Sequence, residues 1–582
     1  MKPINLLAPF ERYADRKLEQ TPPARLYPIL LGALVLLGFL PLLFPGLPHG
    51  HDSYYHLSRI ATVGENIRHG VLLPFINYDA LDGYGYGSGL FYPDLFLYPF
   101  GLLAATGLSV VFIYKLFLFV WGVLTAYSMY WVAKRISGDA LAGFAAALLY
   151  SWSSYHVCDM IIRAAIGEYM AFLFIPWCMY GLWSILYEDR DKYSCTALAV
   201  GYAGVFYCHN ISFVLMCIAG GLLTAFKLPV LLRDIRRIGA LIRAGLLALC
   251  LAAFGWVPLV QQLLGLKFIL NTYTTSSAIT EGIVPVIRLF LELPYMKMEY
   301  TIPPGIGIIF VIVYCQRLRI KSNWTQAERF RDVCLIIGFV SLIASSEFLP
   351  WQGLMRVIAA IQFSWRFYLL ATSFAALGGG LLMGALLAGR PVATRRAWIL
   401  ILICGCGFPW WFLHCYQYAA KISEHHFIHS FTSEEASRYI ASGLFFVPPG
   451  RKDPDYRDPE RNALAISDNP DAAAEVTRSD WDKLEITFSG FSPGDAFEIP
   501  RIYYIGYHVE TDQGGAIDIS RQEHFRFRPN ASSGKAVVVY RPTTPQLISL
   551  AVSFLALAGL VLMASLSRWK PCGKQGREET AR

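Results

Sequence analysis

Three ionisable side chains follow the first long apolar segment of this sequence with helical spacing. Asp52, His56 and Arg59 stand at positions i, i+4 and i+7, so a helix over 52–69 places them on one face. A carboxylate can accept a proton, and a guanidinium can hold a phosphate through two parallel N–H groups. This face is therefore a candidate site for substrate binding and proton transfer.

Other ionisable residues lie near the ends of later apolar segments, where placing a charge is costly and indicates a function. On separate helices such residues can converge on one cavity. There the carboxylates could bind a metal or act as a base, and the arginines could bind phosphate. Besides the first three residues, the candidates are Asp94, Asp159, Arg163, Glu168, His209 and Arg366.

Most of these residues also have a purely structural explanation. Asp52 is a residue type favoured at helix N-caps, and Arg163 and Glu168 could form a structural ion pair. His209 could be a buried histidine with its hydrogen bonds satisfied. Arg366 could only anchor its helix, although arginine is disfavoured on the outer side of a membrane, which favours a role for it.

Histidines beside Asp52 raise the question of a metal. His49, His51 and Asp52 are candidate ligands of a divalent metal, and the cofactor is left unknown by the sequence. The run His49–His51 resembles part of the zinc motif of the soluble enzyme 6-pyruvoyl-tetrahydropterin synthase. That family uses three histidine ligands, and no upstream partner histidine lies in this loop, so pterin synthase activity is not expected.

Composition places most of the chain in a lipid environment. Of the 582 residues 55% are hydrophobic and only 16% are charged, and the mean hydropathy is +0.42, which excludes a soluble globule for the bulk of the chain. Apolar runs of about 17 to 25 residues can cross a bilayer as helices. We predict an α-helical polytopic membrane protein with about twelve spans, near 26–45, 109–133, 139–156, 167–187, 195–209, 211–229, 245–265, 302–316, 332–349, 367–389, 398–416 and 546–567.

Lysine and arginine predict the orientation of these spans. They precede the first span, occupy every second loop after it and follow the last span, and such basic flanks stay in the cytoplasm. Both termini are therefore predicted to be cytoplasmic, with the protein in the inner membrane and its candidate residues outside. Topology and contact with anionic membrane lipids explain the net charge of +8, and no nucleic-acid partner is expected.

Hydropathy also divides the chain into segments. Alternating apolar and polar residues at 484–488, 502–505 and 537–540 predict strands, hence a small, mostly β extracytoplasmic domain near the C-terminus. The predicted parts are a cytoplasmic tail (1–25), a transmembrane bundle (26–416) with a large first outer loop (46–108), the β-rich domain (417–545), the last span (546–567) and a second tail (568–582).

Five short motifs stand out along the chain: His51–Arg59 (HDSYYHLSR), Leu90–Asp94 (LFYPD), Arg163–Glu168 (RAAIGE), Gln362–Phe367 (QFSWRF) and Tyr503–Tyr507 (YYIGY). Together they resemble a known membrane family, called 6-pyruvoyl-tetrahydropterin synthase related. More distantly they resemble the GT-C glycosyltransferase superfamily with its lipid-linked-sugar enzymes and YfhO-like proteins.

This resemblance implies a GT-C-like fold and transfer of a sugar from a polyprenyl-phosphate donor to a glycan, lipid or protein acceptor in the cell envelope. It implies Asp52 as the catalytic base or metal ligand and Glu168 and Asp94 as supporting acids. Arg163 and Arg366 would bind the donor phosphate. The first motif has a single Asp flanked by histidines where better-known members have an acidic pair, which leaves the metal requirement open.

Two other functions remain open at this stage. A transporter or flippase would place charges near the middle of the membrane on broken, duplicated helices, whereas here the charges lie at one rim and no duplication is seen. A non-catalytic envelope assembly protein would need no acid. In the outer domain Trp481, Tyr503, Tyr504 and Tyr507 could bind an acceptor glycan, or serve as core.

Overall fold

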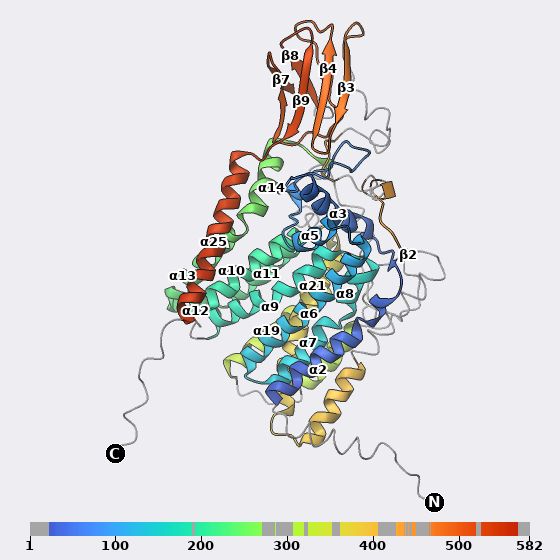
Figure 1. Cartoon of the computed structure of the whole chain (residues 1–582). Helices are drawn as coiled ribbons and strands as arrows, with labels where there is room; N and C mark the ends of the chain where they lie inside the picture. Colours follow the sequence, from blue (N-terminus) through green and yellow to red (C-terminus); the bar gives the residue numbers. More distant parts are fainter. Residues whose placement is uncertain are drawn as a thin grey trace, which may run out of the picture.

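The computed structural model describes a helical bundle with small sheets at one end (Figure 1). It covers residues 23–188, 193–269, 306–318, 324–351, 361–405, 467–519 and 525–568, with short stretches between 427 and 449 and the single positions 286 and 465. Most of both predicted tails, 1–22 and 569–582, lies outside the described residues.

Apolar side chains hold the bundle together. Helix α9 packs against α10, and α21 lies against both α7 and α19, with one buried core running through these helices. The bundle helices are α2 (Pro23–Gly38), α6 (Val110–Ser137), α7 (Ala140–Ser151), α9 (Ile166–Leu186), α10 (Ser194–Cys208), α11 (Asn210–Phe226), α12 (Leu228–Arg233), α13 (Ile235–Leu251), α14 (Ala253–Gly265), α18 (Ile306–Leu318), α19 (Gln326–Ala344), α21 (Phe367–Leu387) and α25 (Thr544–Arg568).

The described helices agree with a multi-pass membrane protein, but the predicted count of twelve spans is not confirmed. By length and composition, four helices among the described residues could cross a membrane: Val110–Ser137, Ile166–Leu186, Ser364–Leu387 and Thr544–Ser565. A fifth span is obtained if α13 and α14 count as one. Four shorter apolar helices, of 10–17 residues, include α7, α10 and α11.

Two predicted spans are interrupted. The span at 245–265 was wrong as a straight helix, because α13 and α14 meet at an angle of 73°. Helix α14 turns towards the sheets, where the Gln262 side chain exchanges two hydrogen bonds with the backbone of Ile505. The span at 139–156 ends early, because α7 stops at Ser151. Of the span at 398–416, only 398–405 is described, and it is helical.

The first outer loop is folded and reaches both the bundle and the sheets. Its elements are η1 (Leu40–Leu43), β1 (Leu47–Pro48), α3 (Ser53–Arg68), α4 (Ser88–Phe91) and α5 (Tyr98–Ala105). The helix predicted over 52–69 is confirmed as α3, which packs against α5. Strand β1 pairs with β2 (Phe427–Ile428), so this loop is tied to a segment far along the chain.

A small β region near the C-terminus is confirmed. Its four-stranded antiparallel sheet has the order β3-β4-β9-β6, and a three-stranded sheet has the order β5-β8-β7. Side chains of β4 alternate between buried and exposed, as the sequence pattern predicts. The strands are β3 (Ala473–Ser479), β4 (Lys483–Ser489), β5 (Phe497–Glu498), β6 (Tyr507–Glu510), β7 (Gly515–Asp518), β8 (Arg526–Pro529) and β9 (Gly534–Tyr540).

One predicted strand is wrong, and the reason lies in the first outer loop. Residues 502–505 form no strand, although Ile502 and Tyr504 are buried. The backbone N–H of Ile502 donates to the carbonyl of Tyr84. Tyr84 and its neighbours share one hydrophobic core with the sheets, so the alternating pattern at 502–505 reflects packing between two distant segments.

Candidate functional site

A π-helical turn and one strained residue shape the first part of the site. After α8 (Ser154–Val157) the chain forms the π-helix η2 (Cys158–Ile162), a form that is frequent at functional sites. Ala164 follows with φ of +52°, a left-handed conformation that costs a residue with a side chain roughly 1–2 kcal/mol. This irregular segment turns Arg163 inward, towards the N-terminus of α9.

Five buried side chains meet there, and we call them the Glu168 cluster: Tyr155, Asp159, Arg163, Glu168 and Arg366. Arg163 Nη1 lies 2.6 Å from Asp159 Oδ1, and its Nη2 lies 3.0 Å from Glu168 Oε1. The same Glu168 oxygen accepts from Arg366 Nε at 3.2 Å, and Tyr155 donates to the other oxygen. One carboxylate therefore holds two guanidinium groups side by side.

Arg366 keeps one donor that the protein does not use. Its Nη1 donates to the carbonyl of Ile361 and to the side-chain oxygen of Gln362, both at 2.8 Å. Its Nε donates to Glu168, whereas Nη2 makes no hydrogen bond to the part of the chain that the structure describes. Gln362 has φ of +64°, so strained backbone flanks this arginine as it does Arg163. The spare N–H group can serve a ligand oxygen.

Asp52 is fixed next to this cluster through its backbone. The N–H groups of His51 and Asp52 donate to the carbonyls of Ile162 and Arg163, at 3.1 and 2.8 Å. Gly50 permits this contact, because a Cβ there would lie 2.5 Å from the carbonyl oxygen of Ile161. The Asp52 side chain is half-buried and interacts electrostatically with the Arg366 guanidinium.

The alternative reading of Asp52 as a helix cap is not what the structure describes. Asp52 occupies the N-cap position of α3, yet its side chain makes no capping hydrogen bond. Its carboxylate is therefore not committed to the first turn of α3. Sequence reasoning placed Asp52, Arg163, Glu168 and Arg366 at one rim, and the structure brings them together.

A second group, which we call the Asp94 cluster, consists of His56, Arg59, Tyr92 and Asp94. Arg59 lies 2.7 Å from Asp94 Oδ1 and donates to the backbone carbonyls of Tyr92 and Pro93. Its Nη1 lies 3.3 Å from His56 Nδ1, and its guanidinium carbon lies 3.9 Å from the centre of the Tyr92 ring. Every nitrogen of Arg59 therefore has a partner within the protein.

Burial controls protonation in the Asp94 cluster. Burial, followed by the nearby positive charge of Arg59, holds the pKa of His56 well below its usual range. Arginine can only donate, so His56 Nδ1 is the acceptor of their contact and the ring is neutral. Burial also raises the pKa of Asp94, against the opposing effect of Arg59. This cluster is a closed, buried network.

His209 and Tyr92, the latter a member of the Asp94 cluster, connect the two clusters. His209 is half-buried, caps α11 through Nδ1 and interacts electrostatically with Glu168, Arg366 and Arg59. The Tyr92 hydroxyl packs directly on Gly167, where a Cβ would lie 1.4 Å from the Tyr92 oxygen. His209 thus has its Nδ1 satisfied, as the structural alternative expected, but it also faces the charges of the Glu168 cluster.

The structure does not gather the proposed metal ligands. Within the described residues, no group of three or more His, Cys, Asp or Glu side chains is placed to hold a metal ion. The ring of His49 lies 5.3 Å from that of Tyr54, and His51 is exposed. Among the described residues, His49, His51 and Asp52 therefore do not form a three-ligand metal site.

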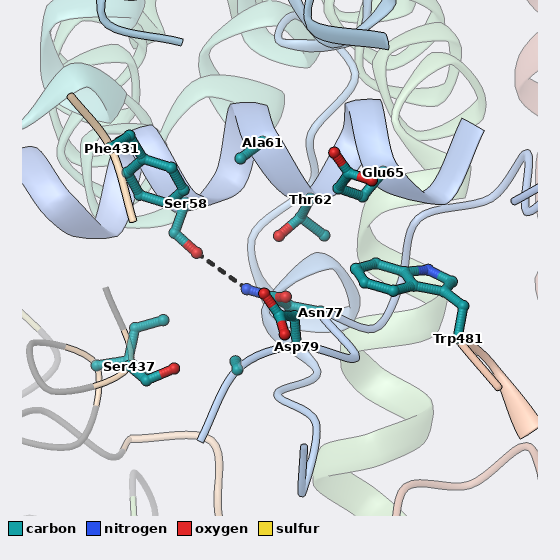
Figure 2. Close-up of a pocket in the computed structure, with 11 residues that line it drawn as sticks. Ser58, Ala61, Thr62, Glu65, Asn77, Asp79, Phe431, Ser437 and Trp481 are labelled. Carbon is teal, nitrogen blue, oxygen red and sulfur yellow. Dashed lines mark hydrogen bonds between the residues drawn. The ribbon is translucent and has the colours of Figure 1, made fainter. Parts of the chain in front are cut away.

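The aromatic residues proposed for an acceptor glycan have different surroundings. Tyr504 and Tyr507 are buried in the core shared by the sheets and the first outer loop. Trp481 is half-buried, stacks on His69 and donates to the side chain of Asn66. It lines a crevice with Glu65 and other side chains of α3 (Figure 2), whose volume of about 20 Å³ holds roughly one water molecule.

Two members of the site were not identified from the sequence. Tyr155 donates to Glu168, and Gln362 orients Arg366. Gln362 lies inside a recognised motif, but nothing marks it apart from its neighbours. Tyr155 follows the polar residues Ser153 and Ser154 after an apolar run, which was the available signal.

Comparisons with known proteins give structural likenesses only. No protein-family model matches the chain. No curated protein matches it at the level of sequence. The resemblance to the family called 6-pyruvoyl-tetrahydropterin synthase related is therefore not shown and stays a prediction.

Three solved structures resemble parts of this chain. The apo oligosaccharyltransferase of Archaeoglobus fulgidus shares 12% identity over 74% of this chain and 60% of its own, with a TM-score of 0.38. Arabinofuranosyltransferase AftD from Mycobacteria shares 11% identity over 88% of this chain and 40% of its own, with a TM-score of 0.39. ArnT from Cupriavidus metallidurans, bound to undecaprenyl phosphate, shares 12% identity over 62% and 79%, with a TM-score of 0.25.

Proposed function

We propose that this protein is a GT-C-like membrane glycosyltransferase that transfers a sugar from a polyprenyl-phosphate donor to an acceptor outside the inner membrane. The observation that carries the proposal is the Glu168 cluster. There Arg366 keeps a donor that the described residues do not use, and it interacts electrostatically with Asp52. Sugar transfer needs a base for the acceptor hydroxyl and, near it, an arginine with an unused N–H group that can bind the donor phosphate.

In this mechanism Asp52 accepts the proton of the acceptor hydroxyl. The acceptor oxygen forms a bond to the anomeric carbon, and the bond from that carbon to the donor phosphate oxygen breaks. Polyprenyl phosphate leaves with the bonding electrons. Asp52 suits the proton transfer because its backbone is anchored on Arg163 while its side chain stays half-buried at the rim.

The arginines stabilise the charge that develops on the leaving phosphate. Arg366 Nη2 supplies the direct contact, and Arg163, which pairs with the same Glu168 oxygen, contributes further positive charge. Glu168 is held by two guanidinium groups and a tyrosine hydroxyl, which makes it a poor base. We therefore assign Glu168 to positioning the two arginines, and His209 to the adjacent wall of the site.

The Asp94 cluster holds in place the helix α3 that begins next to Asp52. Arg59 is saturated by Asp94, His56 and two backbone carbonyls, so it fixes α3 against the segment 92–94. In this proposal His56, Arg59 and Asp94 position Asp52 at the start of α3, and do not contact the substrate.

Basic residues at the opposite helix ends support the proposed orientation, with both termini cytoplasmic.

Profiling of glycans and lipid-linked sugars in cell membranes tests the proposal. The strains carry wild type, a deletion, Asp52→Asn or, as a matched control, Asp512→Asn in an exposed turn between β6 and β7. We expect the deletion and Asp52→Asn to lose the same modification and to accumulate its lipid-linked donor, and the control to match wild type. If Asp52→Asn restores the deletion fully, the catalytic assignment is wrong and transport or assembly becomes the better account.

A further inference from the structure

A larger cavity, with a mostly apolar lining, lies at the opposite end of the bundle from the sheets. Its walls come from the C-terminal ends of α6 and α21 and the N-terminal ends of α7 and α19 (Figure 1). The cavity has a volume of about 460 Å³, which is within the range of small-molecule sites. Leu141, Leu381 and Leu387 line it together with Arg331 and Arg395. Asp139 and Glu328 also line it, so the lining has an apolar part and a part that carries both positive and negative charges.

Arg331 is the distinctive residue of this cavity. It is 1% exposed, and neither of its terminal nitrogens has a hydrogen-bond partner in the part of the chain that the structure describes. Its Nε donates to Asp332 at 2.9 Å, and Glu328 lies 3.9 Å from Nη1, beyond hydrogen-bond distance. A buried guanidinium with unused donors is costly, so this geometry indicates an absent acceptor.

The other charged groups around the cavity are already engaged. Glu328 accepts from the backbone and hydroxyl of Thr325 at the start of α19, and Asp139 accepts from the N–H of Leu141. Arg395 donates through Nε to the carbonyl of Leu387. Asp332 is shared with Arg317, which it meets at 2.6 Å. Glu328 Oε1 forms a long ion pair with Arg331 Nη1, but none of these carboxylates accepts a hydrogen bond from the terminal nitrogens of Arg331.

We propose that this cavity binds the phosphate of an anionic membrane lipid, with Arg331 holding the phosphate oxygens. A guanidinium whose two terminal nitrogens make no hydrogen bond to the described residues can hold a phosphate in a forked geometry. The leucines of the lining accept the apolar part of the lipid. Pockets of this kind between membrane helices bind anionic headgroups on the basic side of the membrane, and the sequence places Lys134, Arg135, Arg390 and Arg396 at this end.

Lipid titration of the purified, delipidated full chain, followed by native mass spectrometry, tests this site. Phosphatidylglycerol is the anionic probe and phosphatidylcholine the neutral one. We expect Arg331→Gln to weaken phosphatidylglycerol binding by about ten-fold or more and to leave phosphatidylcholine binding unchanged. Arg329→Gln, at an exposed position on the same helix, is the matched control and keeps wild-type binding.

A second variant keeps the test decisive if Arg331→Gln does not fold. Ala385 lines the cavity on α21, so Ala385→Phe fills part of it and leaves the arginine in place; it should lower phosphatidylglycerol binding as well. Equal binding of both lipids by wild type overturns the proposal. So does unchanged phosphatidylglycerol binding in both variants. If inorganic phosphate displaces the lipid at equal concentration, the site takes a free anion and the lipid assignment is wrong.

Discussion

Arg59 and Arg366 are two buried arginines at the same end of the bundle, and each is paired with a carboxylate. Arg59 directs all its nitrogens to protein acceptors, whereas the hydrogen bonds of Arg366 to the described part of the chain use only Nε and Nη1. A guanidinium whose nitrogens all have protein acceptors stabilises the fold, whereas one with an unused N–H group can bind a ligand. The Asp94 cluster is therefore a supporting network and the Glu168 cluster a binding site, although the sequence predicted the same role for both arginines.

Removing Arg59 should have the largest effect on stability. Arg59→Met leaves Asp94 buried without its partner, and breaking such a pair costs roughly 3–5 kcal/mol. Thermal unfolding of the purified protein in detergent measures the loss. The double variant Arg59→Met with Asp94→Asn should recover part of it, because no unpaired charge remains. A loss below about 1 kcal/mol would contradict the supporting role of the Asp94 cluster.

Removing Arg366 should affect activity more than stability. Arg366→Gln deletes the spare donor while Arg163 still pairs with Glu168, so sugar transfer should fall about 10²- to 10³-fold, as when one donor to a developing charge is lost. Turnover of lipid-linked donor in membrane vesicles checks this, at expression matched to wild type. Near-normal turnover would show that Arg366, like Arg59, is architectural.

The contact between the clusters can be tested at Gly167. Gly167→Ala places a Cβ against the Tyr92 hydroxyl and 2.9 Å from the carbonyl of Cys208, and such overpacking typically costs about 1–3 kcal/mol. Gly221→Ala is the matched helical control, since nothing lies within 4 Å of a Cβ there. Unfolding midpoints of the two variants decide the question: equal midpoints would mean that the clusters are not in close contact.

The smallest expected effect concerns pH. The pKa of His56 is lowered in the folded protein by burial and by Arg59, so the unfolded state binds more protons. His56 therefore contributes full stability above its usual pKa of about 6.5, and this contribution is lost as pH falls below that value. Melting temperatures from pH 8 to 5 should fall less steeply for His56→Gln than for wild type. Parallel curves would exclude His56 as a source of acid sensitivity.

The sequence predicted the features that depend on local pattern. Helix α3 and strands β4 and β9 were expected at their positions, because hydrophobic periodicity is a property of neighbouring residues. The grouping of Asp52, Arg163 and Glu168 followed from their common side of the predicted bundle. The segment 502–505 was mistaken for a strand because its alternation arises from packing against Tyr84.

Tertiary structure alone decided which candidate residues remain available to a ligand. Arg366 and Glu168 are 198 positions apart, and no local pattern reveals that one carboxylate holds two arginines or that Arg59 is saturated. The bend between α13 and α14 also depends on distant segments, as does the lack of hydrogen-bond partners for the terminal nitrogens of Arg331 within the described residues. Hydrophobic periodicity can be seen in the order of neighbouring residues. The partners of a buried hydrogen-bonding group, in contrast, are determined only when distant helices pack together.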